Sequence, residues 1–259
     1  MRRTYPGSPV QFSFGPSITP AVKMLIWANA GVFVAGMVIP PLGGLLIDLF
    51  GLRPQAVLGG LRIWQPFTYL FLHGGFTHIL FNMLALWMFG SELERLWGTR
   101  YFLQYYFVTG GGAGVAMLVA SLIPSVFGEA MYVTPTIGAS GAVYGVLMAF
   151  AIYYPTRPLY MFPFPIPIPA KYFVMIIGGF VFFSSLNDTG GGVAHMAHLG
   201  GLVVGYVYLK RGSGSGGGLT RFGVMAEVKY RYLRWKMGRL RRKFNVYPGG
   251  KDDWNGRVH

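Results

Sequence analysis

The sequence contains no cysteine and few charged residues, since Asp, Glu, Lys and Arg together make up 12% of its 259 residues. Without cysteine there can be no disulfide bond and no thiolate metal site. A soluble globular domain carries about 25% charged residues, so this scarcity argues against a soluble protein. Acidic residues are the scarcest, at 8 against 22 Lys and Arg, and the formal net charge is +14.

What the chain has instead is apolar sequence, with 53% hydrophobic and 17% aromatic residues and a mean hydropathy of +0.45. A membrane-spanning helix needs about 20 mainly apolar residues. Six segments approach this requirement: Val22–Ile39, Thr77–Leu93, Tyr101–Ile123, Ile137–Tyr154, Tyr172–Leu186 and Gly190–Leu209. The sequence therefore predicts an all-α polytopic membrane protein with a six-transmembrane-helix bundle over residues 21–209.

The distribution of positive charge predicts the orientation of this bundle. With the N-terminus inside, the short inside-facing segments hold nine Lys and Arg, whereas the outside-facing ones hold only Arg53 and Arg62. Cytoplasmic loops carry the excess of Lys and Arg, so we expect both termini in the cytoplasm. Residues 1–20 form a cytoplasmic N-terminal segment without the apolar core of a cleavable signal peptide, which favours a prokaryotic plasma membrane.

The connection Pro40–Phe76 is too long for a hairpin between two spans and too apolar for a free loop; we call it the outer insertion. Irregular backbone at membrane depth is tolerated only against protein or water. We therefore expect this membrane-associated first outer loop to pack beside the helical bundle.

The C-terminal region differs from the rest of the chain, because 13 of the 22 Lys and Arg lie at or after Lys210. Residues 210–218 form a Gly/Ser linker. Residues 219–259 form a basic tail in which Met225, Val228, Tyr232 and Trp235 recur at helical spacing. This pattern predicts an amphipathic helix attracted to anionic lipid of the inner leaflet, and a nucleic-acid partner is poorly motivated.

Four polar side chains converge at one depth of the predicted bundle. Ser140 lies near the outer end of the fourth segment, His78 and Asn82 open the second, and His198 lies in the sixth. Polar residues inside a membrane are costly and mark functional sites. A serine hydroxyl needs an adjacent base to act as a nucleophile, so we interpret Ser140 as the nucleophile and His198 as the base.

The neighbouring residues support this interpretation. Gly138 and Gly141 belong to a small-residue face that lets another helix approach Ser140 closely. Tyr144, one turn after Ser140, could stack on the imidazole of His198. His78 and Asn82, four residues apart, could together donate to a developing oxyanion. Two alternatives stay open: Ser140 could hydrogen-bond its own helix backbone, and His78 and Asn82 could serve only to hydrogen-bond one helix to another.

Three further polar residues are expected to be structural. His73 would order the outer insertion, and His195 lies one turn from His198, although the histidines could also be metal ligands. No HExxH motif and no carboxylate at ligand spacing accompanies them. Glu94, at the inner end of the second segment, is expected to form an ion pair with Arg95 or Arg100. No acid is left for a third triad member, so a Ser–His dyad is predicted.

Five motifs occur in order on these segments. They are His73, His78-x-x-x-Asn82, Gly90-x-x-x-Glu94-x-x-x-Gly98, Gly138-x-Ser140-Gly141 and Ala197-His198-x-x-Gly201-x-x-x-Gly205. Over about Ile63–Tyr208 the chain resembles the rhomboid intramembrane serine proteases. This resemblance implies a six-helix rhomboid-like bundle with Ser140 and His198 as catalytic dyad. It further implies an oxyanion site at His78, Asn82 and the Ser140 backbone, and a lateral substrate gate at the fifth segment.

We therefore expect an intramembrane serine endopeptidase that needs no cofactor or metal and cleaves transmembrane protein substrates in or near their membrane segments. Two alternatives stay open at this point. The first is a rhomboid-like pseudoprotease that binds membrane clients, which the presence of both Ser140 and His198 disfavours. The second is a small transporter, which would need polar residues across the full membrane depth.

Overall fold

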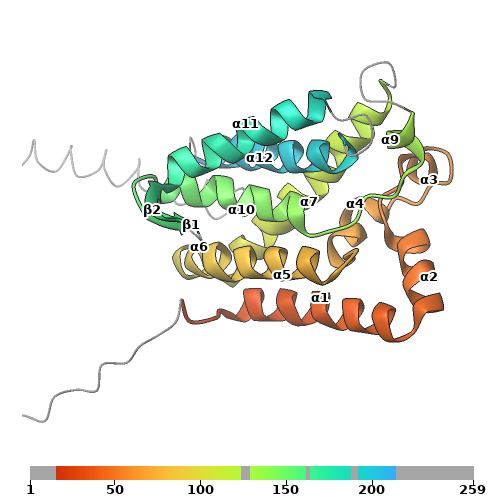
Figure 1. Cartoon of the computed structure of the whole chain (residues 1–259), viewed down its shortest axis with the longest axis horizontal. Coiled ribbons are helices and arrows are strands. Elements are labelled where there is room, and N and C mark those ends of the chain that lie inside the picture. The colour runs from red at the N-terminus through yellow and green to blue at the C-terminus, as the bar shows by residue number, and fades with distance from the viewer. Residues whose placement is uncertain (1–15, 124–128, 162–163, 188–191, 214–259) are drawn as a thin grey trace, which may run out of the picture. The chain divides into compact units, whose positions relative to one another are not determined.

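The computed structural model describes residues 16–123, 129–161, 164–187 and 192–213, which form packed helices and one short β-hairpin (Figure 1). The elements before residue 98 are α1 (Pro20–Val38), α2 (Pro40–Phe50), α3 (Pro54–Leu58), α4 (Gln65–Thr68), η1 (Tyr69–Phe71), α5 (Phe76–Ala85), η2 (Leu86–Gly90) and α6 (Ser91–Trp97). Those after it are α7 (Thr99–Ser121), α9 (Ala130–Val133), α10 (Ser140–Tyr153), β1 (Pro158–Met161), β2 (Phe164–Pro169), α11 (Ala170–Asn187) and α12 (Gly192–Ser213). Most of the predicted N-terminal segment, residues 214–218 of the predicted linker and all of the tail 219–259 lie outside the described residues, whereas residues 210–213, predicted as linker, continue α12.

Each of the six predicted apolar segments falls on a helix. In order they correspond to α1, to the run α5–η2–α6, and to α7, α10, α11 and α12. By length and composition, α1 and α7 suffice to cross a membrane, and the pair Gln65–Phe71 and Phe76–Trp97, bent by 99°, would supply a third span. The chain is thus mostly helical in the part that the structure describes, with helices that are long and apolar enough to cross a membrane.

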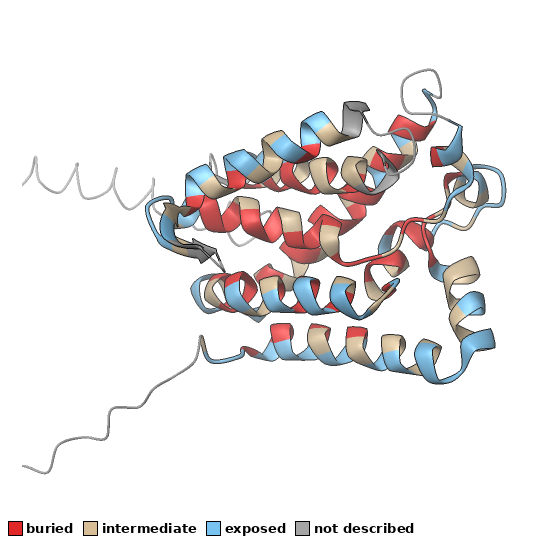
Figure 2. Cartoon of the chain, in the orientation of Figure 1, coloured by how far each residue is buried: buried red, intermediate tan, exposed pale blue. Residues whose placement is uncertain are grey.

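The helices differ in how much of their surface is covered. Figure 2 shows α7 and α10 buried over much of their surface, whereas α1, α5 and α11 are exposed along their outward faces. Large apolar side chains lie on those faces, such as Trp27 (68% exposed) and Phe180 (70%). Apolar side chains on an outer face suit a lipid environment, because lipid tails need no polar partners.

The outer insertion folds into short helices at the end of the bundle where α5 begins (Figure 1). Its turn is closed by the buried Gln65, whose amide donates to the carbonyl oxygens of Asp48 and Leu49. The Gln65 amide oxygen in turn accepts the backbone N–H of Arg53 at 3.1 Å. Because a buried amide must find partners for its donors and acceptor, Gln65 joins both halves of the insertion.

Glu94 does not form the predicted ion pair with Arg95 or Arg100. Its carboxylate accepts the backbone N–H groups of Ala21 (2.9 Å) and Val22 (3.0 Å) and the hydroxyls of Thr19 and Thr99. The first N–H groups of a helix lack intrahelical partners, and an acid stabilises that positive end. Glu94 therefore fixes the start of α1 to α6 and α7, and Arg95 pairs with Glu92 instead.

The Pro163–Pro169 run, interpreted from the sequence as a break between spans, contributes β2. This strand pairs antiparallel with β1, with Leu159 opposite Ile168 and Pro158 opposite Pro169. Prolines alternate with apolar residues along β2, so the ladder uses the N–H groups of the residues between them. The base of the hairpin is closed by the Ala170 N–H, which donates to Arg157 O at 2.9 Å.

Candidate active site

Ser140 is the first residue of α10, and the fourth predicted segment does not begin as helix at Ile137. The residue before it, Ala139, is the N-cap with φ −69° and ψ −6°, and the carbonyl four positions back, Thr136 O, lies outside the helix and accepts the N–H of Leu52. No turn of α10 precedes Ser140, and its hydroxyl lies at hydrogen-bond distance from the His198 imidazole, so the alternative that it bonds its own helix backbone is not favoured. At the start of a helix, the Ser140 backbone N–H is also one of the donors without an intrahelical partner.

The Ser140 hydroxyl on one helix contacts the imidazole of His198 on another. His198 Nε2, from α12, lies 2.7 Å from Ser140 Oγ, a hydrogen-bond distance. Tyr144, one turn after Ser140 in α10, stacks on the same imidazole with ring centroids 4.4 Å apart and planes 8° apart. The stacked ring limits rotation of the imidazole, and a neutral Nε2 can accept the hydroxyl proton.

Gly138 brings a third residue to the site. Its φ is +123°, a conformation that residues with a Cβ rarely adopt. A Cβ built on Gly138 would lie 2.6 Å from His78 Nε2 and 3.7 Å from Ser140 Oγ. His78 Nε2 therefore lies next to the turn that leads into Ser140, and only a glycine leaves room for it.

Asn82 lies one turn after His78 in α5 and is buried, at 6% exposure. Its side-chain amide donates to the carbonyl oxygen of His78 at 2.9 Å. An amide NH₂ carries two donor hydrogens, so one remains for another acceptor. His78 and Asn82 thus share a helix face as predicted from their spacing, but in this conformation Asn82 is anchored to its own helix.

The outer insertion holds the extended segment that leads into Ser140. Leu52 and Thr136 exchange two backbone hydrogen bonds, of 2.9 and 2.8 Å. The Gly138 N–H donates to Tyr69 O at 2.9 Å, and the Ala139 N–H approaches His73 Nε2 at 3.5 Å. His73 thus contacts the turn before Ser140 and does more than order the insertion.

The sequence did not predict these contacts, because most of them use backbone atoms. Leu52, Tyr69 and Thr136 carry no side-chain pattern that would mark them as supports of a site. The one detectable signal is the apolar character of the outer insertion, which indicated packing against the bundle but not against which segment.

Close helix packing brings Ser140 and His198 into contact. A Cβ built on Gly201 of α12 would lie 2.0 Å from Gly141 O, and one on Gly205 would lie 3.2 Å from Gly145 Cα. The backbones of α10 and α12 therefore touch at two glycine pairs. Such contact between helices requires residues without side chains, and it places the histidine of one helix against the serine of the other.

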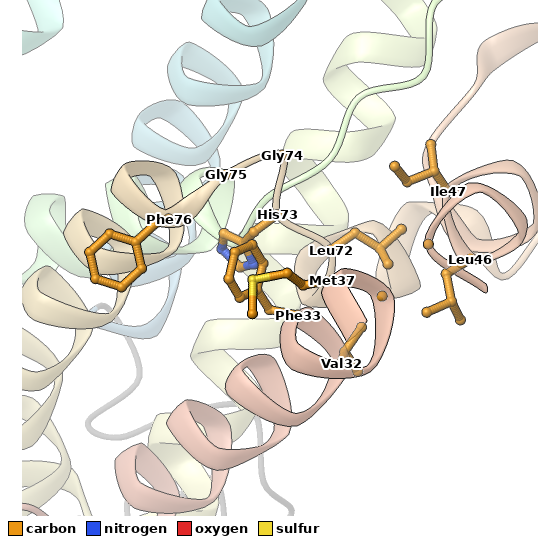
Figure 3. Close-up of a pocket in the computed structure, with 12 residues that line it drawn as sticks. Val32, Phe33, Met37, Leu46, Ile47, Leu72, His73, Gly74, Gly75 and Phe76 are labelled. Atoms are coloured by element: carbon orange, nitrogen blue, oxygen red, sulfur yellow. The ribbon is translucent and has the colours of Figure 1, made fainter. Parts of the chain in front are cut away.

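An apolar cavity of about 400 Å³ opens beside His73, between the end of α1, α2 and the segment before α5 (Figure 3). Its walls include Phe33, Met37, Leu46 and Phe76, with the His73 ring among them. The ring of His73 also packs edge-on against His78, with centroids 5.0 Å apart. The cavity therefore adjoins the group of residues around Ser140.

His195 lies beside this group without entering it. Its ring centroid is 6.2 Å from that of His198, and its Nδ1 is buried without a hydrogen-bond partner. Across the residues that the structure describes, no three His, Cys, Asp or Glu side chains gather closely enough to hold a metal ion. The arrangement is suited to proton transfer between a hydroxyl and an imidazole.

Comparison with known proteins places these residues in a family. The family model of the Rhomboid domain matches residues 60–213. The chain is 30% identical over 223 residues to "Rhomboid protein 1, mitochondrial" of Saccharomyces cerevisiae, a match that covers 80% of this chain and 60% of the relative. It is 32% identical over 157 residues to "Rhomboid protease GluP" of Bacillus subtilis, covering 61% of this chain and 27% of that protein.

A third relative, "RHOMBOID-like protein 12, mitochondrial" of Arabidopsis thaliana, is 30% identical over 203 residues, which is 73% of this chain and 57% of the relative. The chain thus spans less than two thirds of the length of each of these three proteins. Their names point to bacterial and mitochondrial proteins alike, so the similarity indicates a membrane protein without selecting one membrane.

Proposed function

Because the chain belongs to the rhomboid family, we propose that it is an intramembrane serine endopeptidase with Ser140 and His198 as its catalytic dyad. The observation that carries this proposal is the 2.7 Å contact between His198 Nε2 and Ser140 Oγ, with Tyr144 stacked on the imidazole. An imidazole in contact with a serine hydroxyl is the arrangement that activates a nucleophile.

In this mechanism His198 takes the proton from Ser140 while Ser140 Oγ attacks the carbonyl carbon of a substrate peptide bond. His198 then gives the proton to the leaving amine. In the second half of the reaction His198 takes a proton from water, which attacks the acyl-enzyme carbonyl, and returns it to Ser140 Oγ as the ester bond breaks. The reaction is acyl transfer between a hydroxyl, an amide and water, and it needs no cofactor.

The oxyanion that forms during attack needs nearby donors. Three groups support such a site: the Ser140 N–H at the start of α10, His78 Nε2 beside Gly138, and the second amide hydrogen of Asn82. Substrate binding would draw the Asn82 amide toward the oxygen, because catalytic hydrogen bonds often tighten only in the complex.

The proposed substrates are transmembrane segments of other membrane proteins. We place all six apolar segments across the membrane, both termini on the cytoplasmic side, and the outer insertion in the opposite leaflet. A substrate helix would enter beside α11, whose apolar face is exposed, and would unwind locally to present its carbonyls. The apolar cavity beside His73 would then accept an apolar side chain near the cleaved bond.

A fluorophosphonate probe, which reacts with activated serines, tests this proposal on the purified, detergent-solubilised protein. Wild type is expected to be labelled at Ser140, and both Ser140→Ala and His198→Ala are expected to abolish labelling. His195→Ala is the matched control, since it removes a neighbouring imidazole that does not contact Ser140; substantial labelling is expected. Thermal unfolding of each variant shows that it is folded.

Labelling that survives Ser140→Ala would place the activated serine elsewhere and contradict the assignment. A folded wild-type protein that is not labelled at all would favour a rhomboid relative that binds membrane clients without cutting them. Loss of labelling in His195→Ala equal to that in His198→Ala would put the choice of base in doubt.

A further inference from the structure

The two arginines of the outer insertion gather around one carboxylate. Arg53 Nη1 lies 2.9 Å from Asp48 Oδ1, and Arg62 Nη1 lies 3.3 Å from Asp48 Oδ2 and donates to the Asp48 carbonyl at 2.6 Å. Hydrogen bonds from Arg53, and next from Arg62, hold the pKa of Asp48 below its ordinary value. Asp48 is therefore charged, and the cluster of two cations and one anion keeps a net positive charge.

This cluster borders a cavity of about 360 Å³ whose lining is Arg53, Gln55, Ala56, Gly59, Gly60 and Arg62. The guanidinium groups use one nitrogen each in the ion pairs with Asp48, and Arg53 Nε is buried without a partner. Five N–H donors belong to each guanidinium, so the pair has donors to spare. Planar guanidinium forks match the oxygens of a phosphate.

The residues beside this cavity are apolar and exposed. Leu61 is 75% exposed, Ile63 71% and Trp64 44%, and the Trp64 ring is fixed by a bond from Nε1 to Leu49 O at 2.9 Å. Leu61 also adopts a φ of +54°, which is uncommon for a bulky residue. Such a backbone conformation persists where the surrounding structure enforces it. Here it belongs to an exposed leucine directly before Arg62 in the chain.

We propose that Arg53 and Arg62 form a binding site for the phosphate of an anionic phospholipid in the leaflet that the outer insertion faces. The proposal rests on the membrane placement given under the proposed function, but not on catalysis. A phospholipid supplies both partners that this surface lacks, since its phosphate meets the guanidinium donors while its acyl chains cover Leu61 and Ile63. A free phosphate would satisfy only the arginines.

The site has a consequence for the segment that leads into Ser140. Leu52, directly before Arg53, exchanges backbone hydrogen bonds with Thr136, four residues before Ser140. A lipid bound at Arg53 would thus restrain the insertion at the position where it holds the segment that leads into Ser140. The lipid acts here as a support of the insertion and does not touch the reacting atoms.

Native mass spectrometry of the detergent-solubilised full chain tests the proposal, with dioleoylphosphatidylglycerol, dioleoylphosphatidylcholine and inorganic phosphate as separate ligands. Wild type is expected to retain phosphatidylglycerol in preference to phosphatidylcholine. Arg62→Gln is expected to weaken phosphatidylglycerol binding about tenfold, as for loss of one charge-assisted hydrogen bond. Asp48→Asn is expected to strengthen it, because the competing carboxylate is removed.

The opposite signs of these two variants separate a phosphate site from a purely structural ion-pair cluster, in which both would only destabilise the insertion. Arg100→Gln is the matched control, since it removes an exposed arginine of α7, and binding is expected to be unchanged. If Arg62→Gln does not fold, Arg62→Lys keeps the charge without the fork and is expected to bind with intermediate affinity.

Unchanged phosphatidylglycerol binding in a folded Arg62→Gln or Arg62→Lys protein would overturn the proposal. So would inorganic phosphate that binds as tightly as the lipid and displaces it, which would show a free-anion site. Ser140→Ala is expected to bind phosphatidylglycerol like wild type, so a failure of the lipid site and a failure of the proposed protease activity are distinguishable.

Discussion

Gly138 combines two constraints that each require a glycine. Its φ of +123° is costly for any residue with a Cβ, and His78 Nε2 occupies the place where that Cβ would lie. The conformation turns the extended segment into α10 and so directs Ser140 toward His198. A residue without a side chain thus determines where a reactive side chain lies.

The substitution Gly138→Ala is expected to abolish fluorophosphonate labelling, since the positive φ costs about 1–3 kcal/mol and His78 must also move. Labelling and thermal unfolding of the purified variant measure the effect. Gly75→Ala is the control, because a Cβ there meets no atom within 4 Å and Gly75 has an extended φ of 176°. Wild-type labelling of Gly138→Ala would mean that this turn does not position Ser140.

At the scale of residues, side-chain motifs were predictable and backbone supports were not. Ser140, His198 and Tyr144 were recognised because a hydroxyl, an imidazole and a ring at helical spacing carry a chemical pattern, and the structure brings them together. Glu94 was assigned to the wrong partners, because sequence proximity to Arg95 says nothing about the distant N–H groups of α1. Leu52 contacts the site only through main-chain atoms, which every residue possesses.

At the scale of elements, the contact between α10 and α12 depends on glycine pairs. Gly141 faces Gly201 at a distance that admits no Cβ on α12, and Gly145 faces Gly205 at a distance that leaves a Cβ very little room. The small-residue faces visible in the sequence predicted a close approach of these helices. The structure identifies which residues meet. The distance between Ser140 and His198 therefore depends on how closely α10 and α12 pack.

Gly201→Ala is expected to lower activity about 100-fold, because a shift of the helices by about 1 Å misplaces the imidazole, and to destabilise the fold by about 1–3 kcal/mol through overpacking. Cleavage of a transmembrane substrate and thermal unfolding measure the two effects. Gly179→Ala on α11, where a Cβ meets no atom within 4 Å, should leave both nearly unchanged. Equal behaviour of the two variants would contradict the packing argument.

Element boundaries were less predictable than element positions. The apolar content placed all six helices, but Ile137–Ala139 were assigned to a helix because nothing in their composition distinguishes a short extended segment from a helix start. The proline-rich run was read as a break, since prolines are rare inside strands, and β2 forms there because its prolines alternate with residues that keep an N–H.

At the scale of the whole molecule, the basic tail stays a prediction. A peptide of residues 219–259 is expected to bind vesicles of phosphatidylglycerol and to become helical there, because its Lys and Arg are attracted to anionic lipid while its apolar face inserts. Circular dichroism with vesicles checks this. Random-coil spectra with phosphatidylglycerol, or equal binding to phosphatidylcholine, would contradict it, and helix formation with RNA alone would favour the nucleic-acid reading.

The prolines of β2 limit how the free edge of the β-hairpin can pair with another strand. Leu159 and Ile168 face each other across the ladder, so Pro167 and Pro169 stand at the positions whose N–H groups would point to the free edge of β2. A proline has no N–H to offer, and an incoming strand needs donors as well as acceptors to pair. That edge therefore cannot template the addition of a strand from an unfolded neighbour, and the hairpin is protected from growing into an aggregate on that side.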